Sequence, residues 1–288
     1  MKRLLVVLLF SLVGFAAAAA TTFQTRIVRV PAPELHPAVK AMKFLLDRPL
    51  ADSLRDELEL WATWYHMPTV QASPTKPGAV PLLGLDGKAI SPPLSVRDWC
   101  DAAMQGSVWV DDLDGRRTAY VFVDDAGPEQ TDCDHQFGDL SAGIKSATRR
   151  ARFAAFHHPQ GCDVRPMPLL PFRTVAVDPK RFKMGTILFV PELRDHGFWM
   201  EGELYVHDGY DIASDRGGAI KGNHIDMFVA SGGDAPFPDV ISNFSGDTFT
   251  AYVVEKDDPA ALALTASLDL ACEEPRVAVD RGDGFNPV

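Results

Sequence analysis

A glycine-rich turn between two carboxylates is the feature that most constrains the fold of this chain. The turn spans residues 217–222 (GGAIKG), with Asp215 just before it and Asp226 just after it, and apolar runs flank both. Glycine tolerates positive φ and lets a backbone approach another backbone or a ligand closely, and a Gly-Gly pair inside a β pattern indicates a tight turn. The stretch therefore predicts strands that carry aspartates on both sides of a tight connection.

A third aspartate, Asp178, ends the strand-like run of residues 173–177, and Thr186 opens the next apolar run. Carboxylates at strand ends can converge at the mouth of a barrel, where like charges raise one another's pKa. A raised pKa is how a carboxylic acid becomes a general acid near neutral pH. Each aspartate by itself would fit a turn residue that bonds its own backbone, but the ordered set favours a catalytic or substrate-binding site.

These blocks resemble the 3D domain, which is named for its three aspartates and occurs in lytic transglycosylases of the MltA type. The matching segments are residues 176–179 (AVDP), 185–186 (GT) and 215–226, and the resemblance extends over residues 172–229. It implies a six-stranded double-psi β-barrel and cleavage of peptidoglycan glycan strands. We therefore expect a mainly β fold that consists of this barrel, an inserted and elaborated segment, and short flanking helices.

The resemblance also implies roles for individual residues. Asp226 matches the acid/base of the family, and Asp215 and Asp178 match its two companions. The substrate-binding residues that the resemblance suggests are Thr186, Tyr65, Gly217, Gly218 and Lys221. Neither a metal nor a cofactor is expected. Three histidines near the motifs fit packing or surface positions better than the site: His66, His207 and His224.

The implied reaction needs only one carboxylate. Ordinary glycosidases use two, whereas in a lytic transglycosylase the C6 hydroxyl of N-acetylmuramic acid attacks its own C1, with the high effective molarity of an intramolecular reaction. Asp226 would protonate the leaving oxygen and then take the hydroxyl proton, while repulsion from Asp215 would hold the pKa of Asp226 up. The expected function is an exported murein lytic transglycosylase that cleaves the MurNAc-GlcNAc bond and forms 1,6-anhydroMurNAc.

Two other functions remain open at this point. The first is a non-catalytic double-psi barrel that binds glycan strands, as expansin-like relatives do. The second is a metal-dependent hydrolase with the aspartates as oxygen ligands. The intact set of three aspartates favours the enzyme, because a binding module has no need of a shielded acid.

The N-terminus predicts export. Lys2 and Arg3 precede an apolar run over residues 4–15 and an alanine-rich cleavage region, so residues 1–20 fit a signal peptide. The run is shorter than the roughly 20 apolar residues of a spanning helix, and no cysteine follows it to carry a lipid. An uncleaved anchor is the alternative. We expect a periplasmic or secreted protein without a stable membrane span, whose partner is the glycan strand. The net charge of −11 argues against a nucleic-acid partner.

The cysteines support the same compartment. An even number in an exported chain predicts two disulfides, with three pairings open; they are Cys100, Cys133, Cys162 and Cys272. A zinc set would draw on Cys133, His135, His157, His158 and Cys162. These spacings match no compact zinc finger or ribbon, so we favour disulfides.

The chain divides into four predicted regions. Residues 1–20 are the signal peptide, 21–60 a helical segment, 61–254 the 3D-domain barrel with an insertion at about 85–170, and 255–288 a tail. The strands expected in the barrel are residues 60–70, 174–177, 186–190, 203–207, 225–229 and 249–254. In the insertion we expect a helix over 95–105, capped by Ser95, and a hairpin over 106–124. The helices expected on either side of the barrel cover residues 37–58 and 259–268.

Overall fold

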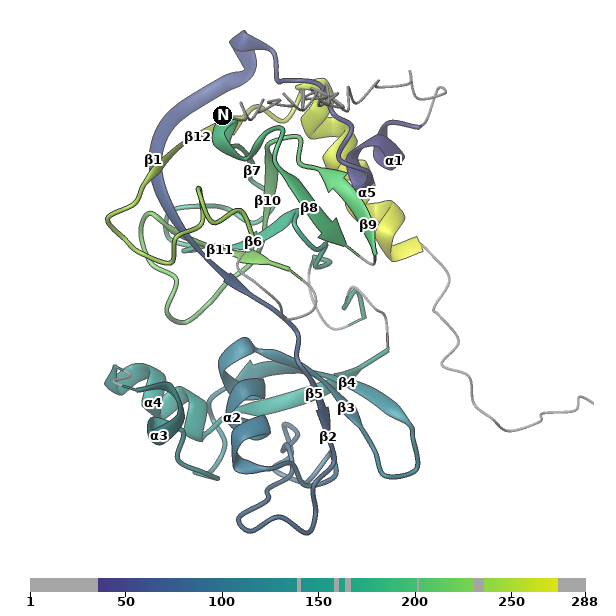
Figure 1. The fold of residues 1–288 in the computed structure, drawn as a ribbon, viewed down its shortest axis with the longest axis vertical. Helices are drawn as coiled ribbons and strands as arrows, with labels where there is room; N and C mark the ends of the chain where they lie inside the picture. The colour runs from purple at the N-terminus through teal and green to yellow at the C-terminus, as the bar shows by residue number, and fades with distance from the viewer. Residues whose placement is uncertain are drawn as a thin grey trace, which may run out of the picture. The chain divides into compact units, whose positions relative to one another are not determined.

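Figure 1 shows the computed structural model, which describes residues 36–138, 141–157, 161–163, 167–200, 202–229 and 236–273. The predicted signal peptide lies outside these residues, as do residues 21–35 and the end of the predicted tail, 274–288. More of the described residues lie in strands than in helices. No helix within the described ranges is both long enough and apolar enough to cross a membrane.

Six strands close into a barrel in the order β1-β11-β6-β10-β7-β12. Their bounds are β1 Leu54–Tyr65, β6 Thr174–Ala176, β7 Ile187–Phe189, β10 Tyr210–Asp215, β11 His224–Phe228 and β12 Phe249–Val254. β1 pairs with β11 and β6 with β10 in parallel, and the other neighbours are antiparallel. Closure leaves no strand edge exposed for pairing with another chain. The predicted six-stranded barrel in a mainly β chain with short helices is confirmed.

Two strand predictions were wrong in detail. β1 begins at Leu54, so the helix predicted up to residue 58 is absent there. Leu60 and Ala62 alternate into the barrel core while Glu57 and Glu59 face outward opposite β12, which is the period of a strand. Pairing with β12, which is distant in sequence, decided between helix and strand for this segment.

The second correction concerns residues 203–207. They form β9 (Glu203–Val206), which pairs only with β8 (Gly197–Met200) in a separate two-stranded sheet. The barrel position belongs instead to β10, which carries Asp211 and Asp215. Aspartate is depleted in strands, so these two carboxylates interrupt the pattern by which a strand would be recognised.

Side chains alternate between two cores across the barrel wall. Leu188 and Ala213 belong to the cluster inside the barrel, whereas their neighbours Ile187 and Ile212 belong to a cluster outside it. The outer cluster is covered by α5 (Pro259–Glu273), whose residue Leu264 is fully buried, and by α1 (Pro37–Met42), which packs beside α5 (Figure 1). The predicted helix at 259–268 is therefore present and extends to residue 273.

A second sheet has the order β2-β3-β4-β5. The bounds of its strands are β2 Thr69–Gln71, β3 Ser107–Asp111, β4 Arg117–Asp124 and β5 Arg152–Phe156. The short helices of this region are α2 Val96–Gln105, α3 Asp134–Phe137 and α4 Ala142–Arg149. Outside this region, single 3-10 turns occur at Ala51–Ser53, before β1, and at Pro191–Leu193, after β7. Ser95 caps α2 by accepting a hydrogen bond from the backbone N–H of Asp98, and β3 and β4 form the expected hairpin. That residues 85–170 form an insertion in the barrel domain stays a prediction.

Two disulfides join the four cysteines. Cys100 in α2 bonds to Cys133, and Cys162 bonds to Cys272 near the end of α5. The prediction of two disulfides is confirmed. The structure shows which of the three pairings left open by the sequence is formed. Because both sulfurs of the suggested zinc set are oxidised, that set does not exist in this structure.

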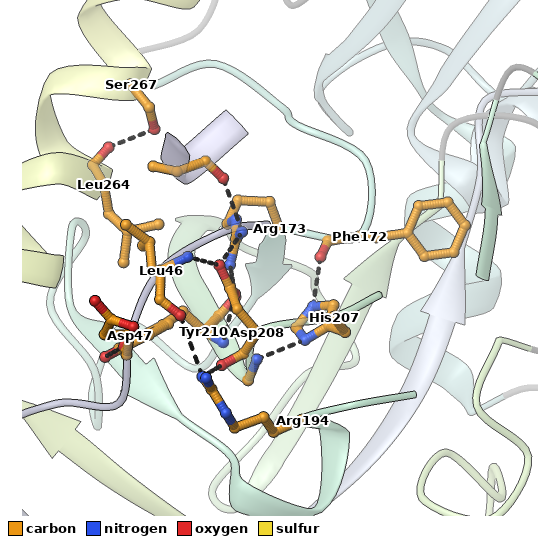
Figure 2. Close-up of polar contacts among 12 residues, drawn as sticks. Leu46, Asp47, Phe172, Arg173, Arg194, His207, Asp208, Tyr210, Leu264 and Ser267 are labelled. Atoms are coloured by element: carbon orange, nitrogen blue, oxygen red, sulfur yellow. Dashed lines mark hydrogen bonds and ion pairs between the residues drawn. The ribbon is translucent and has the colours of Figure 1, made fainter. Parts of the chain in front are cut away.

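A buried ion pair ties the segment before β1 to the barrel. Figure 2 shows the Arg173 guanidinium against both carboxylate oxygens of Asp208, at 2.7 and 3.0 Å. The same guanidinium donates to the carbonyl of Ala41 at 2.8 Å, and the N–H of Leu46 donates to Asp208 at 3.2 Å. Burial raises the pKa of Asp208, but the charge of Arg173 and its hydrogen bonds outweigh burial and hold that pKa below its ordinary value.

His207 lies beside this pair and is almost fully buried. Its Nδ1 accepts from the N–H of Gly209 at 3.0 Å, so Nε2 carries the proton and donates to the carbonyl of Phe172 at 2.8 Å (Figure 2). Burial lowers the pKa of His207 to about 4. The ring is thus neutral at pH 7 and packs inside the protein, as expected from the sequence.

Candidate active site

A row of four paired residues crosses one face of the barrel wall. Thr63 on β1 pairs with Asp226 on β11, Asp226 pairs with Ala176 on β6, and Ala176 pairs with Asp215 on β10. Side chains that are paired in register project from the same face of a sheet. The two carboxylates therefore flank the small side chain of Ala176 on one face, because β6 lies between the consecutive strands β10 and β11.

Asp226 has a hydroxyl donor and a raised pKa. Its Oδ1 accepts a hydrogen bond from Thr63 Oγ1 at 2.6 Å. Burial raises the pKa of Asp226 to about 6, the Thr63 hydrogen bond opposes this rise, and the negative charge of Asp215 adds to it. A carboxyl with a pKa near 6 is present in both protonation states near neutral pH, as a group that first donates and then accepts a proton requires.

Asp215 on β10 is held by a second side chain of β1, the strand that carries Thr63. Tyr65, two residues after Thr63 in β1, donates from its hydroxyl to Asp215 Oδ2 at 2.9 Å. The Tyr65 ring packs on Phe228, with ring centroids 5.3 Å apart. β1 thus supplies one hydroxyl to each acid, because successive odd-numbered residues of a strand lie on one face.

Asp178 occupies another position. One of its carboxylate oxygens accepts from the N–H of Gly222 at 2.9 Å, and the other accepts from the N–H of Lys180 at 3.0 Å. These hydrogen bonds, from Gly222 first and Lys180 second, lower the pKa of Asp178. An ionised Asp178 therefore holds the loop between β10 and β11, and the acid pair consists of Asp215 and Asp226.

The loop at residues 217–222 explains the need for its glycines. A Cβ on Gly217 would lie 2.6 Å from Ile220 Cγ1, whereas a Cβ on Gly218 would meet no atom within 4 Å. Gly222 has φ of +61°, a conformation that favours glycine. Ile220 is buried in a cluster with Tyr65, so the loop is held close to the acids at one end and by Asp178 at the other.

Two of the predicted substrate-binding residues lie at the edge of this arrangement. Lys221 is exposed on the loop, and its charge contributes to the lowered pKa of Asp178. Thr186 precedes β7, and its carbonyl accepts from the N–H of Ala213 at 2.9 Å. In the described part of the chain, the Thr186 hydroxyl makes no hydrogen bond to any of the three aspartates. A role for Thr186 in substrate binding stays a prediction.

Trp61 and His224 are paired in register on β1 and β11, on the same face as Thr63 and Asp226. His224 is buried, which agrees with the packing role suggested by the sequence, and it also contacts the site. The Trp61 and His224 rings stack with their centroids 3.6 Å apart and an interplanar angle of 8°. His224 Nε2 lies 2.8 Å from Thr63 Oγ1. The sequence pattern that could have placed His224 near the site is its spacing from Asp226. The two residues are two positions apart on one strand and therefore share a face.

No group of three or more His, Cys, Asp or Glu side chains suited to hold a metal ion occurs among the described residues. Each of the three aspartates instead accepts hydrogen bonds from protein donors. Asp178 binds backbone N–H groups, and Asp215 and Asp226 each accept from a hydroxyl. The site is thus built from carboxyl, hydroxyl and imidazole groups.

No curated protein matches the sequence. Among solved structures, Escherichia coli MltA with bound chitohexaose is 17% identical, with a TM-score of 0.45 over 68% of this chain and 71% of that chain. A membrane-bound lytic murein transglycosylase from Agrobacterium tumefaciens is 15% identical, with a TM-score of 0.42 over 72% and 75%. The lytic transglycosylase LtgG of Burkholderia pseudomallei is 19% identical, with a TM-score of 0.35 over 69% and 72%.

A family model matches more specifically. It is described as the 3D domain and covers residues 173–237, which include Asp178, the glycine-rich loop, Asp215 and Asp226. These are the residues on which the resemblance seen in the sequence was based. The chain therefore contains a 3D domain.

Proposed function

We propose that this protein is a lytic transglycosylase that cleaves the MurNAc-GlcNAc bond of peptidoglycan and forms 1,6-anhydroMurNAc. The observation that carries the proposal is the Asp226 carboxyl, whose pKa burial raises to about 6 in the same row as a second carboxyl, Asp215. The 3D domain, which occurs in transglycosylases of the MltA type, supports the choice of substrate.

The proton moves as follows. The neutral Asp226 carboxyl donates a proton to the glycosidic oxygen, and the bond from that oxygen to C1 of MurNAc breaks. The C6 hydroxyl of the same sugar then bonds to C1, and its proton passes to the Asp226 carboxylate. The carboxyl ends in its starting form, so one acid serves both steps.

The neighbouring groups support this cycle. Because Thr63 donates to Oδ1 of Asp226, the acid proton resides on Oδ2. The Asp215 carboxylate raises the pKa of Asp226 and also stabilises positive charge that develops on the sugar ring in the transition state. Asp178 keeps the glycine-rich loop in place.

The proposal includes an exported location. Disulfides persist in oxidising compartments such as the bacterial periplasm, and this chain contains two of them. The glycan strand is accessible from that compartment.

The test is release of 1,6-anhydro muropeptides from purified sacculi, measured by mass spectrometry. The substitution Asp226→Asn keeps the size of the side chain but removes the acid, and we expect a loss of at least about 10²-fold. Asp257→Asn, at an exposed aspartate, is the matched control and should cleave as the wild type does. Wild-type turnover by Asp226→Asn would show that the assignment is wrong. Binding to sacculi without any anhydro product from the wild type would favour the glycan-binding alternative.

A further inference from the structure

The Thr63 hydroxyl lies between two groups but has only one proton to donate. It is 2.6 Å from Asp226 Oδ1 and 2.8 Å from His224 Nε2. The shorter contact is typical of a hydroxyl that donates to a carboxylate. When Thr63 donates to Asp226, its oxygen must accept the second hydrogen bond, and His224 must then carry a proton on Nε2.

The surroundings of His224 agree with such a neutral donor. The ring is buried, and burial lowers its pKa to about 4, so it carries a single proton at neutral pH. Stacking on Trp61 fixes the plane of the ring and therefore the direction of the Nε2–H bond. The opposite tautomer would turn Nε2 into an acceptor, attract the Thr63 proton and leave Asp226 Oδ1 without its donor.

We propose that His224 is a positioning residue for Asp226. By donating from Nε2 to Thr63, His224 directs the Thr63 proton to Oδ1 and so keeps the acid proton of Asp226 on Oδ2, where it is available to substrate. The use of that proton on a glycan rests on the function proposed above, whereas its placement does not.

Asp215 on β10 is the ionisable group that acts on Asp226 through its charge, and Tyr65 binds Asp215. The pKa of His224 responds to burial. Removing the His224 donor should therefore weaken the Thr63–Asp226 hydrogen bond and raise the pKa of Asp226, because that bond favours the ionised form.

Two substitutions separate this role from packing. His224→Phe keeps a ring to stack on Trp61 but has no donor, whereas His224→Gln loses the ring but places an N–H near the position of Nε2. The pKa of Asp226 is measured by carbon NMR titration of its carboxyl in the wild type and in both variants. This readout does not depend on turnover.

We expect His224→Phe to raise the pKa of Asp226 by about one unit, the scale of one hydrogen bond to a charged group, and His224→Gln to restore most of the wild-type value. In the sacculus assay, the alkaline limit of the pH–rate profile should shift in the same direction. An unchanged pKa in His224→Phe, or a larger change in His224→Gln than in His224→Phe, would overturn the inference. If the pKa shifts as expected but the wild type releases no anhydro product, the proposed function fails and the positioning of Asp226 by His224 stands.

Discussion

Asp211 is a buried carboxyl whose ionisation should control how stability depends on pH. It lies in β10 and pairs in register with Leu188, and its side chain is fully buried. Within the described residues, neither carboxyl oxygen has a hydrogen-bond partner. Burial raises the pKa of Asp211 to about 8, against the opposing charge of Arg173. The group is therefore a neutral acid in the folded protein at pH 7.

The sign follows from proton binding. An aspartate in the unfolded chain has a pKa of about 3.9, so between pH 4 and 8 the folded state holds a proton that the unfolded state has released. The free energy of unfolding contributed by this group falls as pH rises, by about 1.4 kcal/mol per pH unit. From pH 5 to pH 8 the loss amounts to about 4 kcal/mol, and it levels off above the folded pKa.

The substitution Asp211→Asn preserves shape and removes the titration. Urea unfolding with the disulfides intact, followed by tryptophan fluorescence at pH 5, 6.5 and 8, should show the variant gaining on the wild type by about 4 kcal/mol over this range. Titration of the histidines is common to both proteins and cancels in the difference. Asp257→Asn, which is exposed, should show no such trend. A difference that stays within about 1 kcal/mol from pH 5 to 8 would refute the reasoning, since Asp211 would then be ionised in the folded state.

Three further predictions concern the loop and the disulfides. Gly217→Ala places a methyl group against buried Ile220 and should lower stability by about 1–3 kcal/mol, while Gly218→Ala, its matched control, should change stability by less than about 0.5 kcal/mol; equal effects in chemical unfolding would contradict the geometry. Thiol titration of the unfolded, unreduced protein should find no free thiol. Replacing Cys162 and Cys272 together by Ala should destabilise the protein by about 4–5 kcal/mol, because that bond closes a loop of 110 residues, and full retention of stability would refute this.

The sequence already contained much of the site. Asp178, Asp215, Asp226 and the glycine-rich loop were recognisable because each depends on a local property. Glycine is needed where the backbone turns tightly or a side chain would clash, and the spacing of aspartates around it is a linear pattern. The Ser95 cap and the hairpin after it were predictable for the same reason. The six-stranded barrel was implied by the resemblance to the 3D domain, and the number of disulfides by the even count of cysteines in a chain expected to be exported.

The strand partners were not predictable from such patterns. A period of two indicates which side chains share a face but not which strand lies beside which, so the helix predicted before residue 58 and the barrel strand predicted at 203–207 were both wrong. Only pairing with β12 made residues 54–60 a strand, and only closure of the barrel gave β10, with its two aspartates, a place in the wall.

The chemical state of each acid likewise required the tertiary structure. The sequence by itself determined that three aspartates accompany a GGAIKG loop in a 3D domain. The fold decided that Asp178 binds backbone N–H groups and stays ionised, that Asp226 is partly buried with a pKa of about 6, and that His224 reaches it through Thr63. A pKa depends on burial and on neighbouring donors and charges, and these come from strands that only the closed barrel brings together.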